Sequence, residues 1–200
     1  MKQAPVGLMS IHLSSRRSVA RRSNHVEPHG TVAIARHYIK DLVYGATDGI
    51  ITTFAVVAGV TGGALSHSAV LIVGAANLAA DGLSMAVGNF LAIRAHESAR
   101  EADDLPEEES RPWRHAAATF VAFVVAGSVP LLPYVVPAAQ GKEFAWSAAS
   151  TLASLFAVGA ARATVTVDRW WAAGLEMLLL GVVVAAVAFG AGALIALAVS

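Results

Sequence analysis

Residues 44–59 have the sequence YGATDGIITTFAVVAG, and this stretch decides the fold class. With its apolar flanks it is long enough for a membrane helix, which needs about 20 apolar residues. Yet Asp48 lies in its first third, and a charge at the bilayer centre costs about 2.5–3.5 kcal/mol. Such a carboxylate faces protein, water or a cation rather than lipid. The stretch therefore predicts a membrane helix and a functional residue within it.

The whole chain has the composition of a membrane protein. Of its 200 residues 56% are apolar and 14% are charged, and the mean hydropathy is +0.61, whereas roughly 25% of an average soluble domain is charged. We therefore expect an all-α membrane protein with five transmembrane helices. The predicted spans are residues 42–62, 69–93, 116–137, 144–161 and 172–198. Pro130 and Pro133 should bend the third span or end its regular part.

The positions of the basic residues predict the topology. Thirteen of the fourteen Lys and Arg residues lie in the N-terminal segment and in the second and fourth connections, and only Lys142 lies on the other side. Cytoplasmic loops carry the excess of basic residues, so the N-terminus is predicted to be cytoplasmic and Ser200 to lie across the membrane. Residues 1–35 are expected to be a disordered basic tail before a transporter domain at 36–200. The Ser- and Arg-rich tail also fits an organellar targeting segment.

The residue types limit the chemistry. There is no cysteine, so disulfides and thiolate metal sites are excluded, and any metal needs oxygen, imidazole or thioether ligands. No nucleophile with a base and an orienting residue, phosphate loop or closed His site is evident, so we expect neither an enzyme nor a bound cofactor.

The second span carries a polar stripe. Four residues at steps of four lie on one helix face, and they are Asn77, Asp81, Met85 and Asn89. Oxygen ligands suit divalent cations, and a sulfur ligand favours a transition metal such as Fe²⁺ or Mn²⁺ over Mg²⁺ or Ca²⁺. The alternatives are that Met85 only fills space and that Asn77 only bonds a neighbouring helix.

The intramembrane acids need a counter-charge. Asp48 and Asp81 have no intramembrane Lys or Arg to neutralise them, so they need a metal ion, a proton or water. Both can bind protons as readily as metal, which is what proton coupling requires. Glu176 lies near the cytoplasmic end of the last span, where a solvated role and a proton-coupling role remain open.

The polar connection at residues 94–115 is rich in acidic residues. If the second helix continues into the cytoplasm, His96 or Glu97 lies on one face with Glu101, and the group can collect cations. The alternative is a solvated acidic loop.

Pairs of glycines at four-residue spacing predict close helix packing in the first span. Gly45 and Gly49 form one pair, and Gly59 and Gly63 form the other. The first pair flanks Asp48, and we interpret it as the means of bringing two such helices of a dimer together.

Three segments resemble the vacuolar iron transporter family, which includes nodulin-21-like and bacterial members. They are DLVYGATDGIITTFAVVAGVTGG (41–63), ANLAADGLSMAVGNFLAIRAHES (76–98) and WWAAGLEMLLLGVVVAAVAFGAG (170–192). The resemblance covers the chain from about residue 36 onward. It implies a five-helix homodimer that exports Fe²⁺, and often Mn²⁺, from the cytoplasm in exchange for protons. The implied path lies between the protomers and is lined by the first and second helices, with Asp48, Asn77, Asp81 and Met85 at the motif positions.

Two departures from the family pattern qualify the resemblance. Many members have an acidic residue where this chain has Asn89, and a neutral amide cannot balance charge. The yeast and plant members have a long Glu-rich segment between the second and third helices, whereas this chain has only about twenty residues there. The short form favours a bacterial plasma membrane over a vacuole, and the alternative function is a non-transporting membrane scaffold.

Overall fold

The computed structural model describes residue 23 and residues 28–136, 141–164 and 166–199. The predicted tail at residues 1–35 falls mostly outside this part of the chain. The described part is all-helical, and five of its helical segments are long and apolar enough to cross a membrane, as predicted. The elements are α1 (Thr31–Gly62), α2 (His67–Ala102), α3 (Pro112–Gly127), η1 (Val129–Leu131), α4 (Leu132–Val135), α5 (Glu143–Arg162) and α6 (Trp170–Val199).

The observed helices differ from the predicted spans at their ends. Helix α1 begins at Thr31, before the predicted span and inside the segment assigned to the tail, and α2 continues to Ala102. Both extensions carry polar residues, which a search for apolar runs does not include. In the third span the regular helix ends at Gly127, and Pro130 lies in the 3₁₀ turn η1 that follows, as the prolines predicted.

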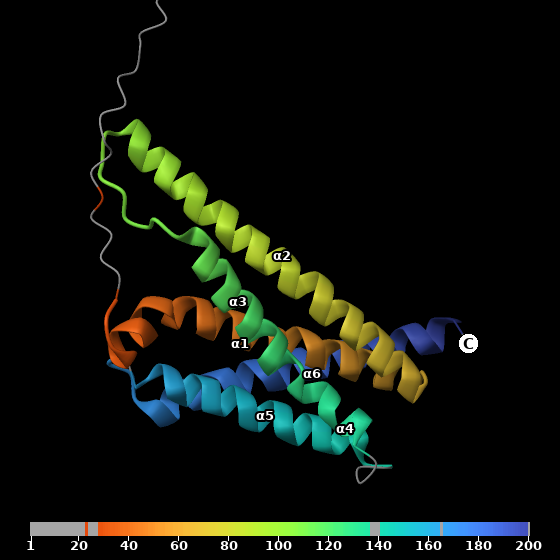
Figure 1. The fold of residues 1–200 in the computed structure, drawn as a ribbon. Coiled ribbons are helices and arrows are strands. Elements are labelled where there is room, and N and C mark those ends of the chain that lie inside the picture. The colour runs from red at the N-terminus through yellow and green to blue at the C-terminus, as the bar shows by residue number, and fades with distance from the viewer. Residues whose placement is uncertain (1–22, 24–27, 137–140, 165, 200) are drawn as a thin grey trace, which may run out of the picture.

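Helix α1 lies at the centre of the bundle. It contacts α3 and α6 most extensively and also packs against α5 and α2 (Figure 1). Helix α2 instead packs mainly along α3, so it lies at the edge of the bundle (Figure 1). The core around α1 includes Phe54, Val57 and Phe123, and a second cluster joins Ile50 to Leu155 and Met177.

The glycines of α1 are used within the chain, which corrects the prediction that they bring two copies of this helix together. A Cβ at Gly45 or Gly49 would collide with the backbone of α3 at Thr119 or Phe123. A Cβ at Gly62 would collide with the backbone of α6 at Phe189. The small residues therefore set the α1–α3 and α1–α6 contacts of one protomer.

Large apolar side chains are exposed on several helices, including α2 and α6. On α2 they include Ile72, Leu83 and Val87, and on α6 they include Leu179 and Val183. Apolar surface of this extent is typical of helices that face lipid or another membrane helix. The protein is therefore a multi-pass membrane protein.

Candidate metal centre

The predicted membrane residues come from α1 and α2. Asp48 lies in α1, and Asn77, Asp81 and Met85 follow one face of the unbroken helix α2. The Asp48 and Asp81 carboxylates are close enough to repel each other. We call Asp48, Asn77, Asp81 and Met85 the membrane stripe.

Three side-chain groups of the membrane stripe lack partners among the described residues. Within the described part of the chain, neither the Asp48 nor the Asp81 carboxylate has a hydrogen bond or an ion pair. The amide nitrogen of Asn77 is buried and also has no hydrogen-bond partner there. Buried polar atoms normally have hydrogen-bond partners, so these side chains remain available to bind a ligand.

Two methionine side chains, those of Met85 and Met177, lie in or near the membrane stripe. Met85 is half-buried and packs against the core cluster that contains Phe54 and Phe123. On the other side of α1, the hydroxyl of Thr47 donates to the Sδ atom of Met177 on α6, at 4.0 Å. The sequence analysis did not single out Met177, because one methionine in the very apolar last span is usually a packing residue.

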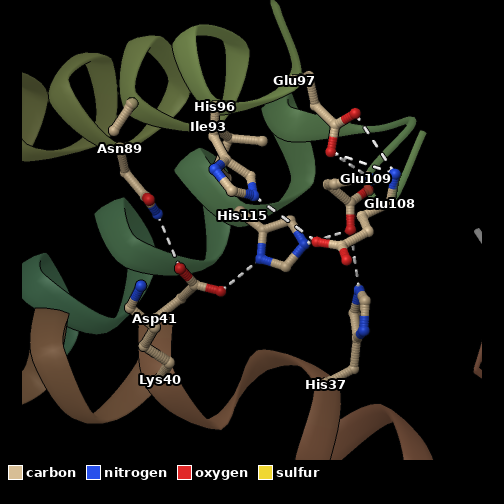
Figure 2. Close-up of a pocket in the computed structure, with 11 residues that line it drawn as sticks. His37, Lys40, Asp41, Asn89, Ile93, His96, Glu97, Glu108, Glu109 and His115 are labelled. Carbon is tan, nitrogen blue, oxygen red and sulfur yellow. Dashed lines mark hydrogen bonds and ion pairs between the residues drawn. The ribbon is translucent and has the colours of Figure 1, made fainter. Parts of the chain in front are cut away.

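A second polar region lies where α1 and α3 begin. It surrounds a cavity of about 380 Å³, lined by residues from α1, from the C-terminal part of α2, from the connection after it and from α3 (Figure 2). This is the end of the bundle that the basic residues assign to the cytoplasm. We call it the end pocket.

Two histidines and one glutamate converge in the end pocket (Figure 2). The Nε2 atom of His115 lies 2.9 Å from Oε2 of Glu109, and the Nε2 atom of His37 lies 3.3 Å from the same oxygen. One ligand atom from each residue falls within 4.8 Å of the others. The three side chains come from α3, the connection and α1.

Neighbouring side chains hold this group in place. The Nδ1 atom of His115 lies 2.5 Å from Oδ2 of Asp41, which is only 5% exposed. Asn89 donates its amide hydrogens to Oδ1 of Asp41 at 2.7 Å and to the Thr119 hydroxyl at 2.8 Å. Asp41 is therefore fixed from two helices and orients the His115 ring.

The connection is also anchored. The buried Glu97 carboxylate accepts hydrogen bonds from the backbone N–H groups of Glu108 and Glu109, the shorter one at 2.9 Å. Glu108 pairs with Arg100 at 3.0 Å and lies 3.6 Å from His96. The hydrogen bonds to Glu97 set the position from which Glu109 reaches the two histidines.

The structure separates the remaining predicted residues from the membrane stripe. Asn89 and Glu97 line the end pocket, where Asn89 orients Asp41 and Glu97 anchors the connection. Glu101 is exposed near the end of α2. Glu176 is exposed and pairs with Arg162 at 3.1 Å rather than with either membrane aspartate.

The sequence analysis missed the part played by His37, Asp41 and His115. One signal was present, because His37 and Asp41 are four residues apart and share a helix face if the first span begins early enough. Their partner His115 is 74 positions from Asp41, and no local pattern connects the two.

The fold and the membrane stripe together define a class of protein. Carboxylates that lie between the helices of a multi-pass membrane protein are typical of ion transporters. Sequence comparison then gives the particular family. The VIT family model matches residues 39–111 and 95–193, and the chain belongs to the VIT family. Its members are transporters and not enzymes, in agreement with the prediction.

Several relatives are named as vacuolar iron transporters. A protein of Eucalyptus grandis named vacuolar iron transporter 1 is 26% identical over 223 aligned positions, which cover 83% of this chain and 88% of that protein. The Arabidopsis thaliana protein of the same name is 27% identical over 83% of this chain and 88% of its own length. A vacuolar iron transporter of Toxoplasma gondii is 40% identical over 97 residues, covering 44% of this chain and 32% of that protein.

Proposed function

We propose that the protein carries a divalent transition metal ion, Fe²⁺ or Mn²⁺, from the cytoplasm across the membrane in exchange for protons. The observation that carries the proposal is the pair of carboxylates, Asp48 and Asp81, that approach each other between α1 and α2 without a partner in the described chain. Two negative charges held together away from bulk water repel, and a bound cation or proton relieves the repulsion. Iron as cargo is supported by the names of the relatives.

The other members of the membrane stripe support a transition metal. Asn77 contributes an amide whose nitrogen has no hydrogen bond within the described part of the chain, and rotation of the amide by half a turn would present its carbonyl oxygen instead. Met85 contributes a thioether, which Mg²⁺ and Ca²⁺ do not favour. Oxygen ligands with one weak sulfur ligand therefore suit Fe²⁺ or Mn²⁺.

Proton exchange follows from the same two carboxylates. A metal ion binds the deprotonated form, so its arrival displaces protons and its release allows them to return. Because Asp48 and Asp81 are the only acids of the stripe, they are the residues that bind the metal ion and the protons in turn. The direction we propose is export from the cytoplasm, which is supported by the vacuolar iron transporter names of the relatives.

A homodimer in a bacterial plasma membrane is part of this proposal. The glycines of α1 are occupied by α3 and α6 within one chain, so they do not supply the dimer contact. The exposed apolar face of α2, which includes Leu83 and Val87, remains available for a second copy.

Flux through proteoliposomes tests the proposal. Liposomes with an acidic lumen should take up Fe²⁺ or Mn²⁺ while protons leave, as a metal-sensitive dye and a pH-sensitive dye inside them report. Asp48→Asn should reduce the flux by about 100-fold, the effect of about 2.7 kcal/mol. The matched control is Glu176→Gln, which also neutralises an acid but at an exposed position paired with Arg162, and it should transport normally.

Two results would contradict the proposal. Equal flux in the wild type and in Asp48→Asn would remove Asp48 from the mechanism. No metal flux by a folded wild-type protein would favour the alternative, a membrane scaffold that retains the family fold.

A further inference from the structure

The end pocket brings three metal-ligand atoms together, and the hydrogen bonds of His115 indicate which ring nitrogen faces the other ligands. Because the Asp41 carboxylate accepts hydrogen bonds, the Nδ1 atom of His115 beside it is the donor, and Nε2 of the neutral ring is then an acceptor. That Nε2 atom points at the carboxylate oxygen Oε2 of Glu109, another acceptor, at 2.9 Å. Two acceptors at this distance repel unless a cation or a proton lies between them.

His37 faces the same oxygen. Its Nε2 atom lies 3.3 Å from Oε2 of Glu109, so two imidazoles from different helices converge on one carboxylate (Figure 2). We propose that His37, Glu109 and His115 bind one divalent first-row transition metal ion in the end pocket. This site is separate from the membrane stripe and does not depend on the proposed transport.

The ligand distances fit a metal ion after a small adjustment. Ligands at about 2.0–2.2 Å around a tetrahedral metal lie about 3.4 Å from one another. The His37–Glu109 distance of 3.3 Å already has this value, and the His115–Glu109 distance of 2.9 Å needs to open by only a few tenths of an ångström. Water from the cavity of about 380 Å³ can supply the remaining ligands.

The surroundings of His115 match those of metal-binding histidines. Such residues generally donate the second ring N–H to a carboxylate, which fixes the ring and makes it a better ligand. Asp41 fills this role for His115, and Asn89 and Glu97 hold Asp41 and the connection in position. The site therefore has both its ligands and their supports in place.

The donor set also determines the class of metal. Two imidazoles and one carboxylate suit Zn²⁺, Fe²⁺ and Co²⁺, whereas Mg²⁺ and Ca²⁺ prefer oxygen ligands alone. The end pocket thus selects ions by nitrogen ligands, and the membrane stripe offers oxygen and sulfur. A metal in the end pocket joins the start of α1 to the connection and to the start of α3.

Co²⁺ is a suitable probe because its visible absorption reports ligand number and type. The full-length protein is purified in detergent in the Asp48→Asn background, which removes a charge from the membrane stripe, and it is titrated with Co²⁺ alone. We expect one Co²⁺ per chain with an absorption band, and at least tenfold weaker binding after His37→Gln or Glu109→Gln. The matched control is His96→Gln, which changes another histidine of the same pocket and should bind Co²⁺ as the background protein does.

A thermal-unfolding measurement keeps the result interpretable if a variant folds poorly. Co²⁺ should raise the Tm of the background protein and of His96→Gln but not that of His37→Gln, since a ligand bound only by the native state stabilises it. Equal binding in His37→Gln and in the background protein would overturn the proposal. Absence of Co²⁺ binding would also overturn it and would assign the cluster to a protonated histidine between two carboxylates.

Discussion

The end pocket and the membrane stripe both contain asparagine and aspartate side chains but differ in how these are satisfied. In the end pocket, Asn89 donates to Asp41 and Thr119, and Asp41 also bonds His115. In the membrane stripe, the buried nitrogen of Asn77 has no partner among the described residues. Both asparagines lie on α2, so the difference comes from what the neighbouring helices present to each. Paired polar groups stabilise the fold, and we propose that the unpaired groups of the membrane stripe bind the cargo ion.

The largest expected effect separates activity from stability in the membrane stripe. Asp81→Asn removes one of two repelling charges, so we expect metal flux to fall by about 100-fold while the Tm stays the same or rises. Flux in proteoliposomes and thermal unfolding in detergent measure the two quantities. Asp103→Asn, an exposed acid after the end of the same helix, is the control. A clear loss of Tm with unchanged flux would show that Asp81 stabilises the fold. The membrane stripe and the end pocket would then not differ in role.

The second prediction concerns the end pocket, where a substitution should lower the stability of the fold. Asp41→Ala leaves a ring N–H of His115 and an amide hydrogen of Asn89 without their acceptor, which should cost about 2–4 kcal/mol and lower the Tm by roughly 5–15 °C. Unfolding is followed with a chelator present, so that bound metal does not contribute. Asp103→Ala should change the Tm little. An unchanged Tm in Asp41→Ala would show that pairing in the end pocket does not stabilise the fold.

A third change tests the helix contact that connects the two regions. Gly49→Ala places a methyl group against the backbone of Phe123 on α3, and overpacking of this kind costs about 1–3 kcal/mol. Gly88→Ala is the matched control, because a Cβ there meets nothing within 4 Å in the chain. Thermal unfolding compares the two variants. If Gly88→Ala is the more harmful, the open side of α2 is occupied by a second copy.

The smallest effect concerns the sulfur of the membrane stripe. Met85→Leu keeps the volume and the apolar packing, so the Tm should shift by the equivalent of less than about 1.5 kcal/mol. The preference for Fe²⁺ over Mg²⁺, measured by competition in flux assays, should fall by roughly three- to tenfold, or about 1 kcal/mol. An unchanged preference would assign Met85 to packing alone.

Much of the fold could be predicted from the sequence, because a bilayer imposes length and composition on each span. The five helices and the break of the third span at its prolines follow from these constraints. The ends of α1 and α2 could not be predicted in this way, since both helices continue past the apolar run with polar residues. Glycine spacing indicated a close contact on α1 but not that α3 and α6 occupy it.

The membrane stripe and the end pocket also differ in how far the sequence predicts them. The stripe on α2 could be predicted because Asn77, Asp81 and Met85 follow the period of one helix. The end pocket could not, because His37, Glu109 and His115 come from three segments that only the tertiary fold brings together. Their positions in polar flanks of the spans resemble ordinary interfacial residues, and the shared carboxylate oxygen is visible only in three dimensions.

The length of α2 has a mechanical consequence. The helix runs without a proline from His67 to Ala102, and sharp kinks in helices occur mostly at prolines or at inserted groups. At 1.5 Å per residue, Glu97 lies about 24 Å along the axis from Asp81. A stiff rod of this kind acts as a lever, so any tilt that moves Asp81 away from Asp48 also displaces Glu97. Because Glu97 holds the backbone that carries Glu109, a tilt of α2 that separated Asp81 from Asp48 would also distort the end pocket.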